Sequence, residues 1–117
     1  MGAAALALGV AMIAQASAAQ DGAKKRAGNG SAQAVKRGKA LFEKKCGICH
    51  YATSDAKKIG PGLQGLNKRG AFSANNSKVT DDALKTWIDN GDSLMPPFKD
   101  VLSGDETKDV VRYLRTL

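Results

Sequence analysis

A run of five residues, Cys46–His50, contains both cysteines and the only histidine of this 117-residue chain. Its sequence is CGICH, so two residues separate the thiols and the imidazole directly follows the second thiol. Any fold of this chain must place these three side chains at one site. A chain of this length forms one small domain, and with only 5% aromatic residues a bound cofactor would add useful buried area.

The C-x-x-C-H spacing is the attachment pattern of c-type haem. Each thiol can add to one vinyl group of a porphyrin, and the adjacent histidine then supplies an axial nitrogen to the iron. A thioredoxin-like dithiol would need a βαβ context, which the sequence lacks. Zinc would need a fourth ligand, and the chain has no other Cys or His. A simple disulfide would leave the histidine unexplained. We therefore predict one covalently attached haem c, with Cys46, Cys49 and His50 holding it.

The N-terminal segment predicts export. Residues 1–20 are apolar and small, carry no ionisable side chain, and contain the A-x-A cleavage pattern Ala16-Ser17-Ala18. We predict a secretory signal peptide over residues 1–19 and a periplasmic or otherwise exported protein. No Lys or Arg precedes the apolar run, so a retained membrane anchor is the alternative, although the run is short for a span.

The rest of the chain divides at residue 31. Residues 20–30 are polar, basic and contain glycine, which predicts a flexible linker. Residues 31–117 form the predicted domain, for which we expect no stable membrane insertion. Three helices are predicted there, over about residues 31–45, 80–91 and 103–117. Ser31, Thr80 and Ser103 are suitable N-caps, and Glu106 completes a capping box. The class is therefore all-α, and the long loops between the helices need something to wrap around.

With this motif and these helices, residues 31–117 resemble the small single-haem class I cytochromes c of the bacterial, periplasmic type. Gly38 and Phe42 match the small and aromatic pair of the family's N-terminal helix. Val110, Tyr113 and Leu114 match the face of the C-terminal helix that crosses it. The resemblance implies a cytochrome c fold, in which three main helices and long loops surround one covalently attached haem.

The resemblance also implies roles for the loop Gly60-Pro61-Gly62-Leu63 and its surroundings. The Pro61 carbonyl is expected to accept a hydrogen bond from His50, since metal-bound histidines need such an acceptor. Leu63 and Leu66 are expected to pack on the haem. Arg69 is either a partner of a haem propionate or a solvated surface residue.

Two residues of the C-terminal half complete the expected site. Trp87 is expected to be a core aromatic residue that contacts the haem. Met95 is the only methionine outside the predicted signal peptide, and its LMPPF loop resembles the axial-methionine loop of bacterial cytochromes c. We predict that Met95 is the sixth iron ligand. The alternatives are an open site that binds water and ligation by Lys99.

Histidine and methionine ligation would fill both axial positions and leave no room for a substrate. We therefore predict a soluble, monomeric carrier of single electrons that is not an enzyme. One alternative is a haem enzyme or gas sensor with a labile sixth ligand. The other is a cytochrome module docked on a periplasmic dehydrogenase or oxidase.

The formal net charge is +7, which favours acidic redox partner proteins. Lys57 and Lys58 are candidate docking residues, with general solubility as the other explanation. The sequence has no basic stripe with interleaved aromatic residues, so it does not indicate nucleic acid as a partner.

Overall fold

Helices and loops make up the part of the chain that the computed structural model describes, residues 18–117, and side chains are described from residue 30 onward. The helices are α1 (Ala18–Lys45), α2 (Leu66–Arg69), α3 (Asp81–Asn90) and α4 (Gly104–Leu114). Within residues 18–117 the only extended pairing is an isolated antiparallel bridge between Ala71 and Lys78. The predicted all-α class is therefore confirmed.

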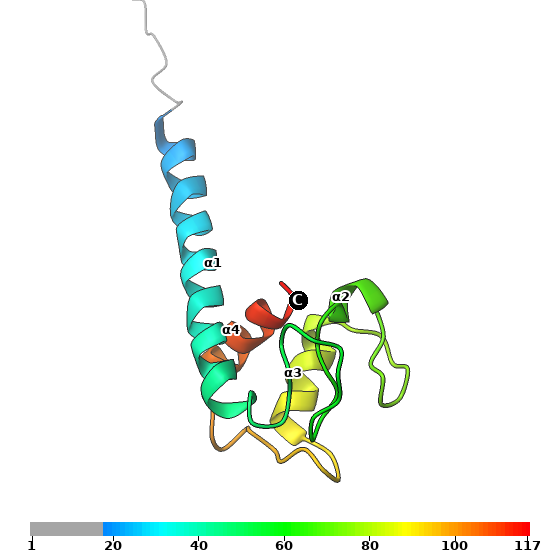
Figure 1. Cartoon of the computed structure of the whole chain (residues 1–117). Coiled ribbons are helices and arrows are strands. Elements are labelled where there is room, and N and C mark those ends of the chain that lie inside the picture. Colours follow the sequence, from blue (N-terminus) through cyan, green and yellow to red (C-terminus); the bar gives the residue numbers. More distant parts are fainter. Residues whose placement is uncertain (1–17) are drawn as a thin grey trace, which may run out of the picture.

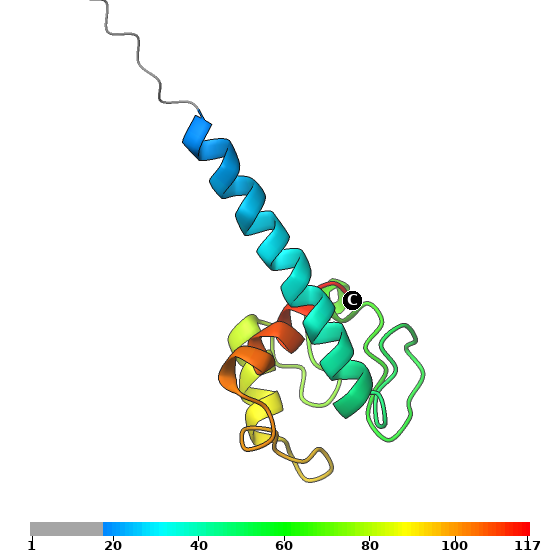
Figure 2. The ribbon, with the colours of Figure 1, turned by 90° about the vertical axis from the view of Figure 1, so that its left-hand side faces the viewer.

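The start of α1 differs from the prediction. The helix begins at Ala18, so Ser31 lies inside it and is not an N-cap. Residues 18–30 contain no proline, and their alanines and basic residues favour a helix strongly enough to outweigh the glycines among them. The backbone over residues 20–30 is thus helical, where a flexible linker was expected. The division of the chain into signal, linker and domain stays a prediction. In Figures 1 and 2 the first half of α1 projects clear of the other elements.

The N-termini of α3 and α4 are capped as predicted. Thr80 Oγ1 accepts a hydrogen bond from the Ala83 amide at 3.1 Å. Ser103 Oγ accepts from the Glu106 amide at 3.2 Å, and the Glu106 carboxylate accepts from the Ser103 amide at 2.8 Å. Each cap satisfies amide groups that have no partner within the first turn of a helix. The final helix ends at Leu114 and not at the chain end.

The second half of α1 crosses α4 at close range. A Cβ atom built at Gly38 would lie 2.5 Å from the carbonyl carbon of Asp109 and closer still to its oxygen. The rings of Phe42 and Tyr113 pack beside this contact, with centroids 5.5 Å apart and tilted by 60°. The buried Asp109 carboxylate accepts from Arg37 at 2.6 Å on one helix and from Arg112 at 2.9 Å on the other. The structure therefore shows the helix crossing that Gly38 was expected to permit.

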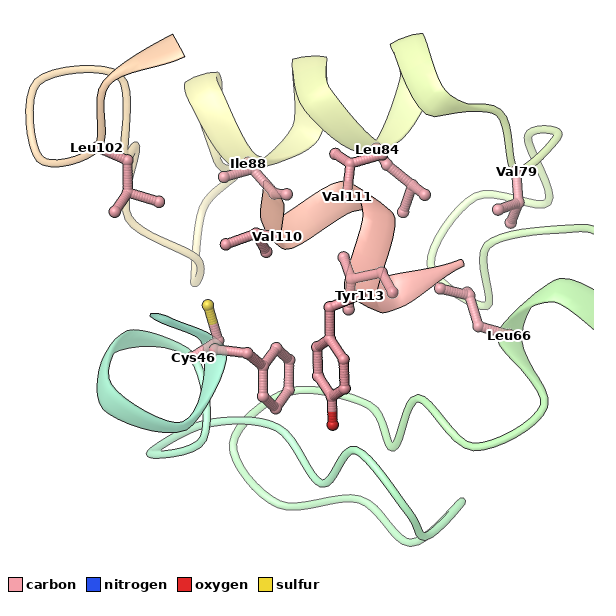
Figure 3. Packing of buried hydrophobic residues seen from close by; sticks show 11 residues of the cluster. Cys46, Leu66, Val79, Leu84, Ile88, Leu102, Val110, Val111 and Tyr113 are labelled. Atoms are coloured by element: carbon pink, nitrogen blue, oxygen red, sulfur yellow. The ribbon is translucent and has the colours of Figure 1, made fainter. Parts of the chain in front are cut away.

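The core lies between these helices and α3 (Figure 3). It consists of buried residues from all four helices and the loops: Phe42, Cys46, Leu66, Val79, Leu84, Ile88, Leu102, Val110, Val111, Tyr113 and Leu114. In Figure 3 the Cys46 sulfur points from the end of α1 toward Val110. The first cysteine of the C-x-x-C-H motif is therefore part of the hydrophobic core.

Candidate haem-binding site

The C-x-x-C-H motif forms a compact turn directly after α1. The Phe42 carbonyl accepts from the amides of Cys46 and Gly47, each at 2.8 Å. The Cys46 carbonyl then accepts from the amides of Cys49 and His50, each at 3.0 Å. This hydrogen bonding continues the helix by one turn and keeps the two cysteines and the histidine on neighbouring positions of one rigid segment.

The two thiols of the motif are free and differ in burial. Cys46 is only 8% exposed, whereas Cys49 is half-buried. Burial, and to a lesser extent the neighbouring Cys49, raises the pKa of Cys46 to about 11. Cys46 is therefore a neutral thiol at physiological pH, as expected for a sulfur that faces an apolar core.

The imidazole of His50 is oriented by the loop that follows it. His50 Nδ1 lies 2.8 Å from the carbonyl oxygen of Pro61. Because a carbonyl can only accept, Nδ1 carries a proton, and in the neutral ring Nε2 then keeps its lone pair. Two further hydrogen bonds join the same segments, from the Gly60 amide to Cys49 and from the Leu63 amide to Tyr51, each at 2.8 Å. The histidine is thus held in the tautomer that a metal requires.

Gly60 lies directly beside the same ring. A Cβ atom at this position would lie 2.8 Å from both ring nitrogens of His50 and closer to Cε1. Real Cβ atoms essentially never approach so closely, so only glycine fits beside the imidazole in this position. The glycine and the Pro61 carbonyl together fix where the ring lies.

The remaining residues expected on the histidine side have different surroundings. Leu66 is buried in the core, and Leu63 packs against the core while half-buried. Arg69 is exposed, and its guanidinium donates to the carbonyls of Gln64 at 2.5 Å and Gly62 at 3.5 Å. Arg69 therefore stabilises the loop that precedes it through hydrogen bonds, and its pairing with a propionate stays a prediction.

Trp87 lies on α3 and is half-buried. Its ring stacks on that of Phe72, with centroids 5.2 Å apart and an angle of 27° between the planes. Phe72 belongs to the loop that the Ala71–Lys78 bridge closes. Trp87 therefore has an aromatic neighbour that the sequence did not indicate, and its contact with haem stays a prediction.

Met95 lies in the loop after α3, is half-buried, and packs against the core. Its amide donates to the Asp92 carboxylate at 2.8 Å, and its carbonyl accepts from the Asp92 amide at 2.9 Å. The amides of Met95 and Leu94 lower the pKa of the Asp92 carboxyl. A lowered pKa means that Asp92 stabilises the loop at neutral pH, and that this contribution is lost as the pH falls through the lowered value.

These residues fit a covalently bound haem. The motif offers two free thiols separated by two residues. The neighbouring histidine has its Nδ1 proton engaged, and its neutral ring has an Nε2 lone pair available. Apolar side chains from two parts of the chain join the same core cluster: Leu63 and Leu66 from the segment after Pro61, and Met95 from the loop after α3. Within the described part of the chain, no cluster of three or more His, Cys, Asp or Glu side chains could hold a metal ion.

Residues 33–114 match the protein family described as cytochrome c oxidase, cbb3-type, subunit III. The chain is 29% identical to cytochrome c of Euglena viridis over 98 residues, which cover 71% of this chain and 96% of that protein. It is 33% identical to cytochrome c type-1 of Ascaris suum over 92 residues, 66% of this chain and 82% of that protein. This chain belongs to the cytochrome c family.

The cytochrome is of the small class I type, and the cofactor of its family is haem c with its iron. The family assignment makes it a haem-containing electron-transfer protein and favours a carrier over an enzyme. No solved structure shows a significant match to it. Within residues 18–117, none of its helices has the length and apolar character needed to cross a membrane.

Two residues that position the expected ligands of the cytochrome were not predicted. Gly60 precedes the predicted Pro61, and only the three-dimensional contact with His50 shows that its missing side chain matters. Asp92 could have been found, because an aspartate often accepts hydrogen bonds from amides two or three residues after it. Both residues act on the backbone or the ring of a ligand, which explains why ligand patterns alone do not indicate them.

Proposed function

We propose that this cytochrome is an exported carrier of single electrons whose haem iron is held between His50 and Met95. The observation that carries the proposal is the 2.8 Å contact between His50 Nδ1 and the Pro61 carbonyl. It engages the Nδ1 proton and so leaves the Nε2 lone pair of the neutral ring available to a metal. The family assignment supports the same role, since it makes the protein an electron-transfer haem protein.

Each site residue has a defined part in this proposal. Cys46 and Cys49 would hold the haem through thioether bonds, and His50 and Met95 would supply the axial nitrogen and sulfur. Leu63, Leu66 and Trp87 would pack against the haem and exclude water from it. When bound, the haem supplies an iron that takes up or releases one electron, and a thioether ligand in an apolar site favours the reduced state.

The backbone around both ligands is restrained, which suits an electron carrier. The segment of His50 is joined to the Pro61 loop by hydrogen bonds, and both backbone polar groups of Met95 bind Asp92. Neither ligand therefore needs to move when the charge of the site changes. Rapid exchange of single electrons requires that the ligands rearrange little.

We propose that acidic redox partners dock on one surface, the motif face, formed by Ile48, Tyr51, Lys57, Lys58 and Ile59. Ile48 and Ile59 are 66% and 57% exposed, so they offer apolar area next to the cysteines. Lys58 Nζ donates to the Gly47 carbonyl at 2.8 Å and lies 5.1 Å from the centroid of the Tyr51 ring. Apolar residues bordered by lysines match a partner with an acidic rim.

The proposed ligation is tested by optical spectra of the purified holoprotein. We expect the bands of a reduced c-type haem and, in the ferric protein, the weak far-red band of an iron–sulfur bond. Carbon monoxide should bind the reduced protein poorly at neutral pH, because the sixth position is filled. Rapid, stoichiometric binding of carbon monoxide would instead identify an open site and favour the enzyme or sensor alternative.

A second function is favoured by the family match, which carries the description of an oxidase subunit. In that case the cytochrome would be a module docked on a larger redox enzyme. Purification from the native source at high salt separates the two functions. A cytochrome that purifies free of any larger protein supports the diffusing carrier, whereas a stable complex supports the module.

Export stays part of the proposal. The apolar segment before α1 and its A-x-A pattern support a signal peptide over residues 1–19. The mass of the mature protein tests it, since cleavage near residue 18 removes the apolar segment, whereas an uncleaved chain would favour the anchor.

A further inference from the structure

The loop that carries Met95 is closed by one side chain, Asp92. The Asp92 carboxylate accepts from the amides of Leu94 and Met95, each at 2.8 Å, and both bonds go to the same oxygen, Oδ1. The Asp92 amide donates back to the Met95 carbonyl at 2.9 Å. Both backbone polar groups of Met95 are therefore bonded to this one residue.

The ends of the loop are joined to the last turn of α3. The Gly91 amide donates to the Trp87 carbonyl at 2.8 Å, and the Phe98 amide donates to the Ile88 carbonyl at 3.0 Å. Gly91 has a φ of 63°, and a Cβ there would lie 2.7 Å from the carbonyl carbon of Pro96. The loop thus returns so closely on itself that a side chain at Gly91 would push Met95 and Pro96 away.

Between its two ends the loop has few other restraints. Leu94 is 79% exposed, and the two residues after Met95 are exposed prolines, which have no amide to donate. Of the side chains in this loop, those of Met95 and Phe98 pack against the core. The Asp92 carboxylate is therefore the main polar group that sets the backbone of Met95.

We propose that Asp92 is a positioning residue that holds the Met95 sulfur at the iron through its hydrogen bonds to the loop. This inference rests on the proposed ligation by Met95. Without an acceptor at position 92, the Leu94 and Met95 amides turn to water and the loop opens more often. An external ligand then competes more successfully for the sixth position.

Three variants separate the hydrogen bonds from the charge. Asp92→Ala removes both, whereas Asp92→Asn keeps an oxygen acceptor of the same geometry and loses only the charge. Asp100→Ala removes the same charge from an exposed aspartate that follows the loop and for which no hydrogen bond is found among the described residues. The comparison of Asp92→Ala with Asp92→Asn thus isolates the acceptor.

The measurement is a titration of the ferric holoprotein with imidazole, followed through the loss of the far-red band, with the denaturant midpoint recorded separately. We expect Asp92→Ala to bind imidazole on the order of tenfold more tightly, because the acceptor of two hydrogen bonds is lost at an exposed site. Asp92→Asn and Asp100→Ala should bind it nearly as the wild type does. The denaturant midpoint of Asp92→Ala should fall only modestly, since the two bonds are lost from the folded state but Asp92 is exposed.

Equal imidazole affinity in Asp92→Ala and the wild type would overturn the inference and leave ligation by Met95 intact. Equal tightening in Asp92→Ala and Asp92→Asn would also overturn it, since the charge alone would then act. A wild-type protein without the far-red band would overturn both proposals. If Asp92→Ala does not fold, Asp92→Leu replaces it, because leucine also lacks an acceptor, and a leucine variant with wild-type affinity is contrary to the inference.

Discussion

At the scale of single residues, the candidate site depends on what lies directly beside each ligand. The imidazole of His50 is bordered by the Pro61 carbonyl and by Gly60, which has no side chain. The backbone of Met95 is bordered by Asp92. The ligands themselves are recognisable in the sequence, but their neighbours decide whether they are held in a usable orientation.

Replacement of Gly60 by alanine tests the space beside the imidazole. We expect Gly60→Ala to destabilise the holoprotein by about 1–3 kcal/mol, because its Cβ would overlap the His50 ring. Chemical denaturation followed through the haem absorbance measures the effect. Gly104→Ala is the matched control, since no atom of the described part of the chain lies within 4 Å of a Cβ at that position. Equal stability of the two variants would contradict the close contact.

Replacement of Met95 by alanine tests the sixth ligand. We expect Met95→Ala to lower the reduction potential by on the order of 0.1 V, a fraction of the roughly 0.8 V range that axial ligands span. It should also let the reduced protein bind carbon monoxide stoichiometrically. Redox titration and carbon monoxide difference spectra measure the two effects. A potential that stays at the wild-type value would point to Lys99 or water as the ligand.

At the scale of helices, local signals and long-range contacts were predictable to different degrees. The caps Thr80 and Ser103 are recognisable because a cap depends on residues within one turn. The start of α1 was not recognisable in the sequence, because a serine that could cap a helix, such as Ser31, can also lie within one. The short helix α2 was expected to be loop, since the glycines around it conceal a single turn. The stack of Phe72 on Trp87 joins distant segments and has no sequence signal.

The crossing of α1 and α4 yields a prediction about a single glycine. Gly38→Ala should destabilise the protein by roughly 1–3 kcal/mol or more, because its Cβ would overlap the Asp109 carbonyl and separate the helices. Gly30 lies on the same helix, and none of the described residues comes within 4 Å of a Cβ there, so Gly30→Ala should stabilise the protein by up to about 1 kcal/mol. Thermal unfolding of the two variants measures the difference, and a Gly38→Ala variant as stable as Gly30→Ala would contradict the crossing.

At the scale of the whole molecule, the fold class and the haem motif followed from the sequence because CGICH and the helix-crossing residues act together. The motif needs only five adjacent residues, and the fold needs a small residue, Gly38, opposite the C-terminal helix. The extent of α1 beyond the core did not follow, since polar residues with glycine are compatible with both helix and coil. The contacts of Arg69 with loop carbonyls were equally hidden, because a long flexible side chain has many possible partners.

The net charge of +7 yields a prediction about kinetics. Oxidation of the reduced protein by a negatively charged oxidant such as ferricyanide should slow as ionic strength rises, because screening weakens the attraction. Lys57→Glu on the motif face should slow the reaction several-fold at low salt, whereas Lys108→Glu on α4 should have a smaller effect. Stopped-flow spectroscopy measures both rates. If both variants slowed the oxidation equally, the rate would depend on the total charge of the protein and not on the motif face.

The ion pair between Arg37 and Asp109 joins residues that are 72 positions apart, and α4 contains the last helical residues of the chain. During synthesis α1 therefore emerges long before its partner does. The helix crossing cannot be completed until α4 has been made, so a nascent chain has no finished core to resist unfolding. The export proposed above is compatible with this order, because a chain whose core closes last can be translocated unfolded and fold afterwards.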